Sequence, residues 1–113
     1  MMEERHKAIR ICDELVLFMV LHYAQNIQTA LEFLPDGFLV TVQGNPQVTD
    51  LELSELADTL KVPRNPSLED YYEELLGTNY HESGDFKLIG MMVDEVDIAY
   101  DQEVLQITCL RRN

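Results

Sequence analysis

Two strand–turn–strand patterns constrain the fold of this 113-residue chain more than any other feature. Apolar and polar residues alternate on both sides of Pro35-Asp36-Gly37, where proline presets φ and glycine accepts a positive φ. A second alternating pair flanks the turn Asp101-Gln102. The expected strands cover residues 27–34, 38–42, 96–100 and 104–110. Alternation with a period of two indicates that each strand has one buried face, so both hairpins need a covering layer.

The remaining periodic segments predict helices that supply this layer. Over 3–24, apolar residues recur at three- and four-residue spacing, and from Leu15 onward the segment is apolar almost all round, which predicts burial on more than one side. Thr49 and Glu52 form a capping box before the next helix. The expected helices cover residues 3–24, 50–61, 68–76 and 86–93, and Gly44-Asn45-Pro46 is expected to end the first hairpin.

This order of elements predicts a single domain over 1–113 with an α+β fold. The economical arrangement is a two-layer α/β sandwich, in which helices cover one face of a mixed or antiparallel sheet. Residues 45–85 form a helical insertion within it, and its polar end, 78–85, is expected to be a loop.

The net charge of −13 limits the choice of partners. Nucleic acids and anionic membranes bind basic surfaces, so the charge argues against both. The acidic side chains form either an ordinary solvated surface or a surface matched to a basic protein partner. The longest apolar run, 15–21, is too short to cross a bilayer, which needs about 20 residues. No signal pattern opens the chain, so we expect a cytoplasmic protein.

The cysteine and histidine residues indicate neither a disulfide framework nor a metal site. Cys12 and Cys109 lie far apart, and we expect both to be buried free thiols. The histidines His6, His22 and His81 do not have the spacing of metal ligands. We therefore expect no bound metal.

Three segments occur in an order that is characteristic of one protein family. They are Glu14-Leu15-Val16 with His22, the paired strands within 27–42, and Val93-Asp94-Glu95-Val96 before the second hairpin. Together they resemble the GHKL superfamily, the ATPase fold of histidine kinases, and most closely its anti-sigma-factor serine kinases. In that family a helix carries a Glu-Leu-Val-x-Asn-Ala-x-x-His-like box, and the second following strand ends in a nucleotide-binding Asp-x-Gly. The resemblance implies a histidine-kinase-like ATPase fold with 45–85 in place of the ATP lid, although no lid motif is present there.

The same resemblance implies a degenerate nucleotide site. Phe18 stands in place of the Mg²⁺-binding asparagine, and a phenyl ring offers no oxygen ligand. The nucleotide-binding aspartate falls at Gly44, or at Gln43 if the register slips by one, and the neighbouring Asn45 lacks a carboxylate's charge. The phosphate loop is reduced to Ser83-Gly84-Asp85, in which Asp85 repels an anion. The degenerate positions are Glu14, Phe18, His22, Gly44, Asn45, Gly84 and Asp85, and we expect no cofactor there.

Several of these residues also have an ordinary structural interpretation. Phe18 is either a core residue or a ring that fills the space of a nucleotide. Glu14 is either a general base or part of a solvated helix face or cap. The methionines Met19, Met91 and Met92 form either core or an adaptable binding surface. The tyrosines Tyr71, Tyr72 and Tyr80 are either packed or exposed as an anchor for a partner.

The sequence favours a nucleotide-free regulatory or protein-interaction domain, a pseudo-ATPase without catalytic residues. The alternative within the same family is an active ATP-binding anti-sigma-factor-type serine kinase with a diverged site. Two further alternatives are a remodelled pocket that binds another small molecule and a homodimeric module that associates through its N-terminal helix.

Overall fold

The computed structural model describes residues 4–65 and 86–113 of the chain. Its elements are α1 (Glu4–Leu21), β1 (Ile27–Leu34), β2 (Gly37–Gly44), α2 (Asp50–Leu60), α4 (Phe86–Met91), β3 (Glu95–Asp101) and β4 (Val104–Arg112). Every helix and strand predicted within these ranges is present, with bounds that differ by a few residues. The helix predicted at 68–76 and the loop at 78–85 lie outside the described residues.

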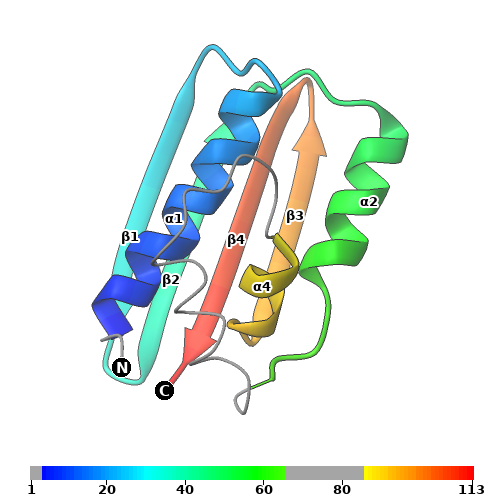
Figure 1. Cartoon of the computed structure of the whole chain (residues 1–113). Coiled ribbons are helices and arrows are strands. Elements are labelled where there is room, and N and C mark those ends of the chain that lie inside the picture. Colours follow the sequence, from blue (N-terminus) through cyan, green and yellow to red (C-terminus); the bar gives the residue numbers. More distant parts are fainter. Residues whose placement is uncertain (1–3, 66–85) are drawn as a thin grey trace.

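The four strands form one antiparallel sheet in the order β1-β2-β4-β3. The two hairpins therefore join through their inner strands, where Thr41 of β2 pairs with Thr108 of β4. Figure 1 shows α1 and α4 in front of this sheet, with α2 beside β3, and both termini at one end of the molecule. The predicted α+β class is confirmed, and the sheet is antiparallel rather than mixed.

The core lies between the helix layer and the two central strands. Alternate residues of β2 and β4 are buried under the helices, as the period-two pattern predicts for strands with one covered face. The buried face of α1 recurs every three or four residues, so it presents one stripe to the sheet. The main contributors are Ala8, Ile11, Leu15, Phe18 and Met19 of α1, Phe38, Val40 and Val42 of β2, and Leu105, Ile107 and Cys109 of β4.

Helix α1 is buried on one face only. Val20 and Leu21 of its last turn are 54% and 44% exposed, so the prediction of burial on more than one side is wrong there. The helix ends at Leu21, earlier than predicted, and Tyr23 then adopts a left-handed conformation with φ of 62°. The apolar residues on the outer side of α1 are thus not covered by the core that the described residues form.

Strand β1 also departs from its predicted environment. Residues 28–33 are exposed on both faces, although the alternation predicts one buried face. The reason is its place in the sheet: β1 is the outer strand, and α1 packs mainly over β2. Leu31 and Phe33 face the helix layer but remain 40% and 39% exposed.

The first turn lacks the positive glycine φ that was predicted, and the second turn lies one residue later than predicted. No described glycine has a positive φ, and Gly37 is required because a Cβ there would lie 1.9 Å from the Arg111 carbonyl oxygen. In the second hairpin, the turn residues are Gln102 and Glu103, with φ of 50° and 66°. β2 continues through Gly44, which was expected to break it.

The predicted helix capping and thiol states are largely confirmed. Thr49 and Glu52 form a reciprocal capping box, with Glu52 N donating to Thr49 Oγ1 and Thr49 N donating to Glu52 Oε1. Cys109 is a buried free thiol, whereas the free Cys12 is only half-buried. Within the described ranges no helix has both the length and the apolar character needed to cross a membrane.

Candidate functional site

Four of the predicted nucleotide-site positions meet at one end of the sandwich. Phe18 and His22 lie on and after the last turn of α1, and Gly44 and Asn45 lie where β2 ends. Gln47 N donates a hydrogen bond of 2.7 Å to the His22 carbonyl, which ties the two segments together. Gly84 and Asp85 lie outside the described residues. The structure therefore brings together the positions that the helix and hairpin contribute.

Phe18 is part of the hydrophobic core and stacks on His22. Its side chain is 5% exposed, and the ring centroids of Phe18 and His22 are 4.2 Å apart. His22 Nδ1 lies 2.9 Å from the Phe18 carbonyl oxygen, so Nδ1 carries the proton and donates it. His22 Nε2 lies 3.3 Å from a carboxylate oxygen of Glu52. This end of α1 is thus joined to the first turn of α2 through an imidazole rather than through a ligand.

Gly44 has little room for the side chain that a nucleotide site needs. A Cβ at this position would lie 3.0 Å from the Asn26 carbonyl oxygen and 3.1 Å from Met19 Sδ. Both distances are tighter than ordinary van der Waals contact, and one neighbour is backbone. An aspartate at Gly44 would require the 24–26 turn to shift.

Asn45 closes the turn that follows α1. Its Oδ1 accepts hydrogen bonds of 2.9 Å from the backbone N–H groups of both Gln25 and Asn26. The side-chain oxygen that could have accepted a hydrogen bond from an adenine is therefore used to hold the chain. Asn45 therefore holds two backbone donors of the turn between α1 and β1.

Glu14 is buried on α1 at 8% exposure, so its interpretation as a residue of a solvated helix face is wrong. Met19 and Met92 are confirmed as core residues, whereas Met91 is half-buried. Neither the sequence nor the described contacts assigns Glu14 a catalytic role.

A hollow of about 510 Å³ opens beside these positions, although Phe18 does not line it. The exposed tyrosines Tyr23 and Tyr100 and the carboxylate of Glu103 come to it from two segments, the turn after α1 and the β3–β4 hairpin. No sequence motif predicted this hollow, because it forms between three turns that lie far apart in the sequence, those after α1, β2 and β3. The full lining is Tyr23, Gln25, Asn45, Pro46, Gln47, Val48, Thr49, Tyr100 and Glu103.

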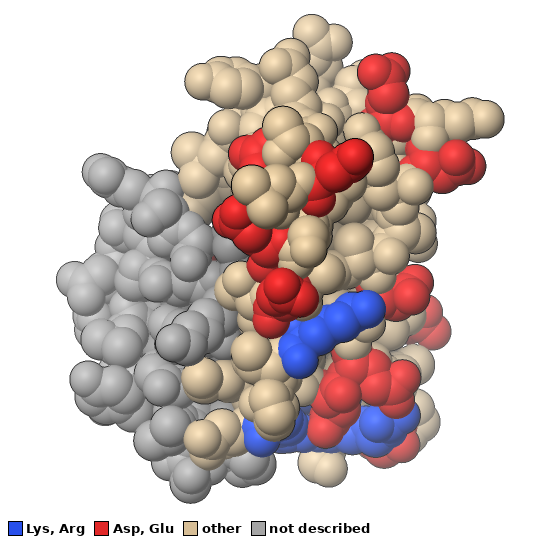
Figure 2. All heavy atoms as spheres, turned by 90° about the vertical axis from the view of Figure 1, so that its right-hand side faces the viewer, with Lys and Arg blue, Asp and Glu red and all other residues tan. Residues whose placement is uncertain are grey.

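An acidic face extends down the adjacent side of the molecule. Figure 2 views this side and shows many acidic and few basic side chains. We define the α2–β3 acidic face by six exposed carboxylates from α2, β3 and the turn after β3: Asp50, Glu55, Asp58, Asp97, Asp101 and Glu103. Nearby, Arg64 and Arg112 are engaged by Asp94 and Glu95. The sequence showed these acids but not that α2 and β3 lie on the same side of the molecule (Figure 1).

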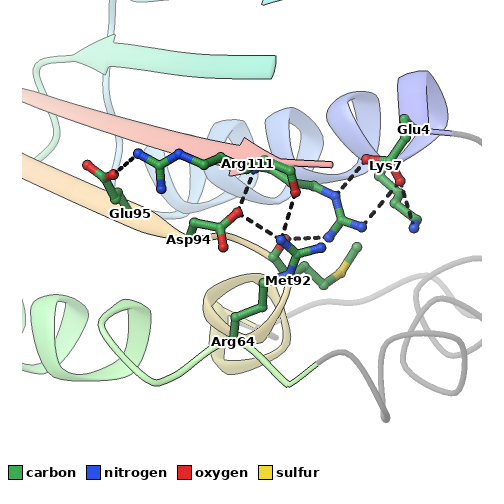
Figure 3. A network of polar contacts seen from close by, with 8 residues as sticks. Glu4, Lys7, Arg64, Met92, Asp94, Glu95 and Arg111 are labelled. Atoms are coloured by element: carbon green, nitrogen blue, oxygen red, sulfur yellow. Dashed lines mark hydrogen bonds and ion pairs between the residues drawn. The ribbon is translucent and has the colours of Figure 1, made fainter. Parts of the chain in front are cut away.

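A second polar cluster closes the opposite end of the sandwich (Figure 3). Arg111, one residue beyond the strand predicted at 104–110, is only 3% exposed. Its Nε donates to Glu4 at 2.8 Å, and its Nη1 donates to the Met92 carbonyl at 2.6 Å. Nearby, the Asp94 carboxylate accepts from Arg64 Nη1 at 2.8 Å and from the Arg112 backbone N–H at 2.6 Å. These contacts join α1, the end of α4 and β4, so we interpret the cluster as structural.

Metal ligation finds no support in the described part of the chain. No three histidine, cysteine, aspartate or glutamate side chains gather there in a way that could hold an ion. Comparison of the chain with protein-family models, curated proteins and solved structures gives no match. The resemblance to GHKL domains therefore rests on the sequence segments described above.

Proposed function

We propose that this chain is a non-catalytic regulatory module that binds a basic protein partner through the α2–β3 acidic face. Its resemblance to GHKL ATPases then reflects descent from a histidine-kinase-like fold without nucleotide binding. The observation that carries the proposal is the excess of acidic over basic side chains on the side of the molecule that Figure 2 shows, together with six exposed carboxylates in α2, β3 and the following turn.

The chemistry at the predicted nucleotide positions supports the absence of ATP binding. Phe18 contributes a ring to the core and no oxygen to a Mg²⁺ ion. Gly44 contributes no acceptor for the adenine amino group and has little room for one. Because two independent contacts are replaced by packing, restoring either residue alone does not restore the site.

Electrostatics supports a basic partner rather than an arbitrary one. A cluster of like charges raises the local potential, attracts an oppositely charged surface and speeds its association. Exposed charges are screened by salt over about 8 Å at physiological ionic strength, so binding through this face weakens as salt rises. A partner with several lysine or arginine side chains fits these properties.

The test compares two doubly substituted variants that lose the same charge. Asp58→Asn with Asp97→Asn removes two carboxylates from the acidic face, and Asp13→Asn with Asp36→Asn removes two from elsewhere on the exposed surface. Affinity for a fluorescent lysine-rich peptide is measured by anisotropy in low salt. We expect the first variant to bind at least about tenfold more weakly and the second to change by less than about threefold. Equal losses would show that only net charge matters and would contradict the proposal.

A further inference from the structure

The outer edge of β1 has the features of an edge that can pair with another strand. β1 spans eight residues in continuous register with β2, and within the described part of the sheet nothing pairs with its other edge. It contains no proline and one charged residue, Glu32, so it lacks the usual features that keep an edge strand from pairing. Its backbone groups are accessible, because residues 28–33 are exposed.

An apolar surface from α1 continues this edge. Arg5 lies over the Phe33 ring at 4.1 Å, and the Cys12 thiol lies near the Thr29 side chain, so this side of α1 runs along β1. Ile9, Val16 and Val20 follow on the same side at helical spacing. The most exposed apolar members of this α1–β1 surface are Ile9 at 48%, Val20 at 54%, Leu31 at 40% and Phe33 at 39%.

The low net charge of this surface favours a second copy of the chain as its partner. α1 and β1 together carry three basic and four acidic side chains, so they account for −1 of the net charge of −13. A basic partner is drawn to the α2–β3 acidic face instead. A second copy of this acidic chain meets little like-charge repulsion at the α1–β1 surface.

We propose that the chain forms a homodimer by antiparallel pairing of β1 with β1 of a second copy. The two four-stranded sheets join into one continuous eight-stranded sheet, and the two α1 helices lie antiparallel on the same face. Pairing centred on Leu31 places Glu32 opposite Ala30 of the second copy and keeps the two Glu32 carboxylates apart. The pairing covers the exposed edge and the apolar outer side of α1 together.

The choice of a second copy as occupant rests on the proposed function of the α2–β3 acidic face, but the test is separate, because it measures mass rather than peptide binding. Sedimentation equilibrium of the full chain at roughly 100 μM is expected to give twice the 13.1 kDa chain mass. Leu31→Lys introduces a charge into the paired edge and is expected to give the monomer mass. Leu51→Lys makes the same change at a 67% exposed site on α2 and is expected to leave the dimer intact.

Three results would overturn the dimer. They are a monomeric wild-type chain at this concentration, a dimeric Leu31→Lys variant, and equal dissociation of the Leu31→Lys and Leu51→Lys variants. If circular dichroism shows that Leu31→Lys is unfolded, Ile9→Lys replaces it, because that side chain is on the exposed side of α1 and its loss leaves the core unchanged. A folded Ile9→Lys chain of unchanged dimer mass would then overturn the proposal.

Discussion

At the scale of single residues, Arg111 shows how a buried charge becomes part of a fold. A guanidinium with 3% exposure is stable only where its donors meet acceptors, and Glu4 and the Met92 carbonyl provide them. Partial burial alone would raise the pKa of Glu4, but hydrogen bonds and charges of Arg111 and Lys7 outweigh it and lower the pKa to about 2. The pair therefore stays ionised at neutral pH.

Removal of this guanidinium is expected to weaken the fold. Arg111→Met leaves the Met92 carbonyl without its charged donor and is expected to lower the free energy of unfolding by about 1.5–3 kcal/mol. Arg112→Met is the matched control, because Arg112 is exposed and its pair with Glu95 contributes less than about 1 kcal/mol. Urea denaturation of both variants provides the measurement, and equal losses would show that Arg111 is not a structural anchor.

Phe18 makes a second prediction at this scale. Because the ring is 5% exposed within the core, Phe18→Ala is expected to cost about 3–5 kcal/mol of stability. Val20→Ala, two residues later on the exposed side of α1, is expected to change the monomer fold little. Thermal unfolding at low concentration, where any dimer has dissociated, measures both. An unchanged melting temperature for Phe18→Ala would mean that the ring does not fill the space we assign to it.

At the scale of elements, the β3–β4 turn carries conformational strain. Gln102 and Glu103 both have positive φ, as in the type I′ turn that joins two strands tightly, but neither is the glycine or asparagine that this turn favours. A left-handed conformation costs an ordinary residue about 1–2 kcal/mol.

Glycine at the second turn position is therefore expected to stabilise the hairpin. Glu103→Gly is expected to raise the free energy of unfolding by up to about 1 kcal/mol, because part of the relief is offset by a more flexible unfolded chain. Glu103→Ala removes the same carboxylate but keeps the backbone cost, so it separates the two effects. Chemical denaturation should show a higher free energy of unfolding for Glu103→Gly but not for Glu103→Ala. A gain of similar size in Glu103→Ala would mean that the stabilisation comes from loss of the carboxylate charge.

The elements also show what the sequence could and could not predict. The alternation of β2 and β4 predicted their buried faces correctly, because both strands lie in the middle of the sheet. The alternation of β1 is equally regular, yet its residues are exposed, because a pattern does not reveal which strand lies at an edge. The apolar outer side of α1 was visible in the sequence, but only the structure shows that it is uncovered.

For the candidate site, too, the sequence predicted the positions of residues but not the contacts that they make. The resemblance implied that Phe18, His22, Gly44 and Asn45 belong to one site, and in the structure they lie at the same end of the sandwich. The roles of Asn45 as a turn cap and of Glu14 as a buried residue depend on contacts between segments, which no local pattern encodes. The α2–β3 acidic face likewise depends on which elements lie side by side.

At the scale of the whole molecule, charge and apolar surface are separated. Acidic side chains are prominent on the side of the molecule that Figure 2 shows, whereas five of the nine exposed large apolar side chains of the described residues belong to α1 and β1. This separation allows the chain to associate with itself at one surface and with a basic partner at the other.

Stability is expected to fall in acid because several carboxylates are held ionised. The pKa values of Glu4 and Asp94 are lowered by hydrogen bonds and charges of arginines against a burial effect that raises them, and that of Glu52 is lowered by its hydrogen bonds to Thr49. A group whose folded-state pKa is lowered stabilises the fold above its unfolded pKa and loses that contribution as pH falls. For Glu4 this window runs from 4.5 down to about 2.

The substitution Glu4→Gln tests this dependence directly. Because the variant has no carboxylate to protonate at position 4, its urea midpoint is expected to fall less than that of the wild type between about pH 6 and pH 3. Glu32→Gln removes an exposed carboxylate of β1 and is expected to retain the wild-type pH dependence. Parallel curves for wild type and Glu4→Gln would contradict the assignment.

The central claim is that this chain binds proteins and does not bind nucleotide, and calorimetry with Mg-ATP tests it most directly. With Phe18 in the core and no acceptor at Gly44, we predict no heat of binding when the full chain is titrated with Mg-ATP up to about 1 mM. A saturable one-to-one isotherm with a micromolar Kd would contradict the account and favour a diverged but active kinase.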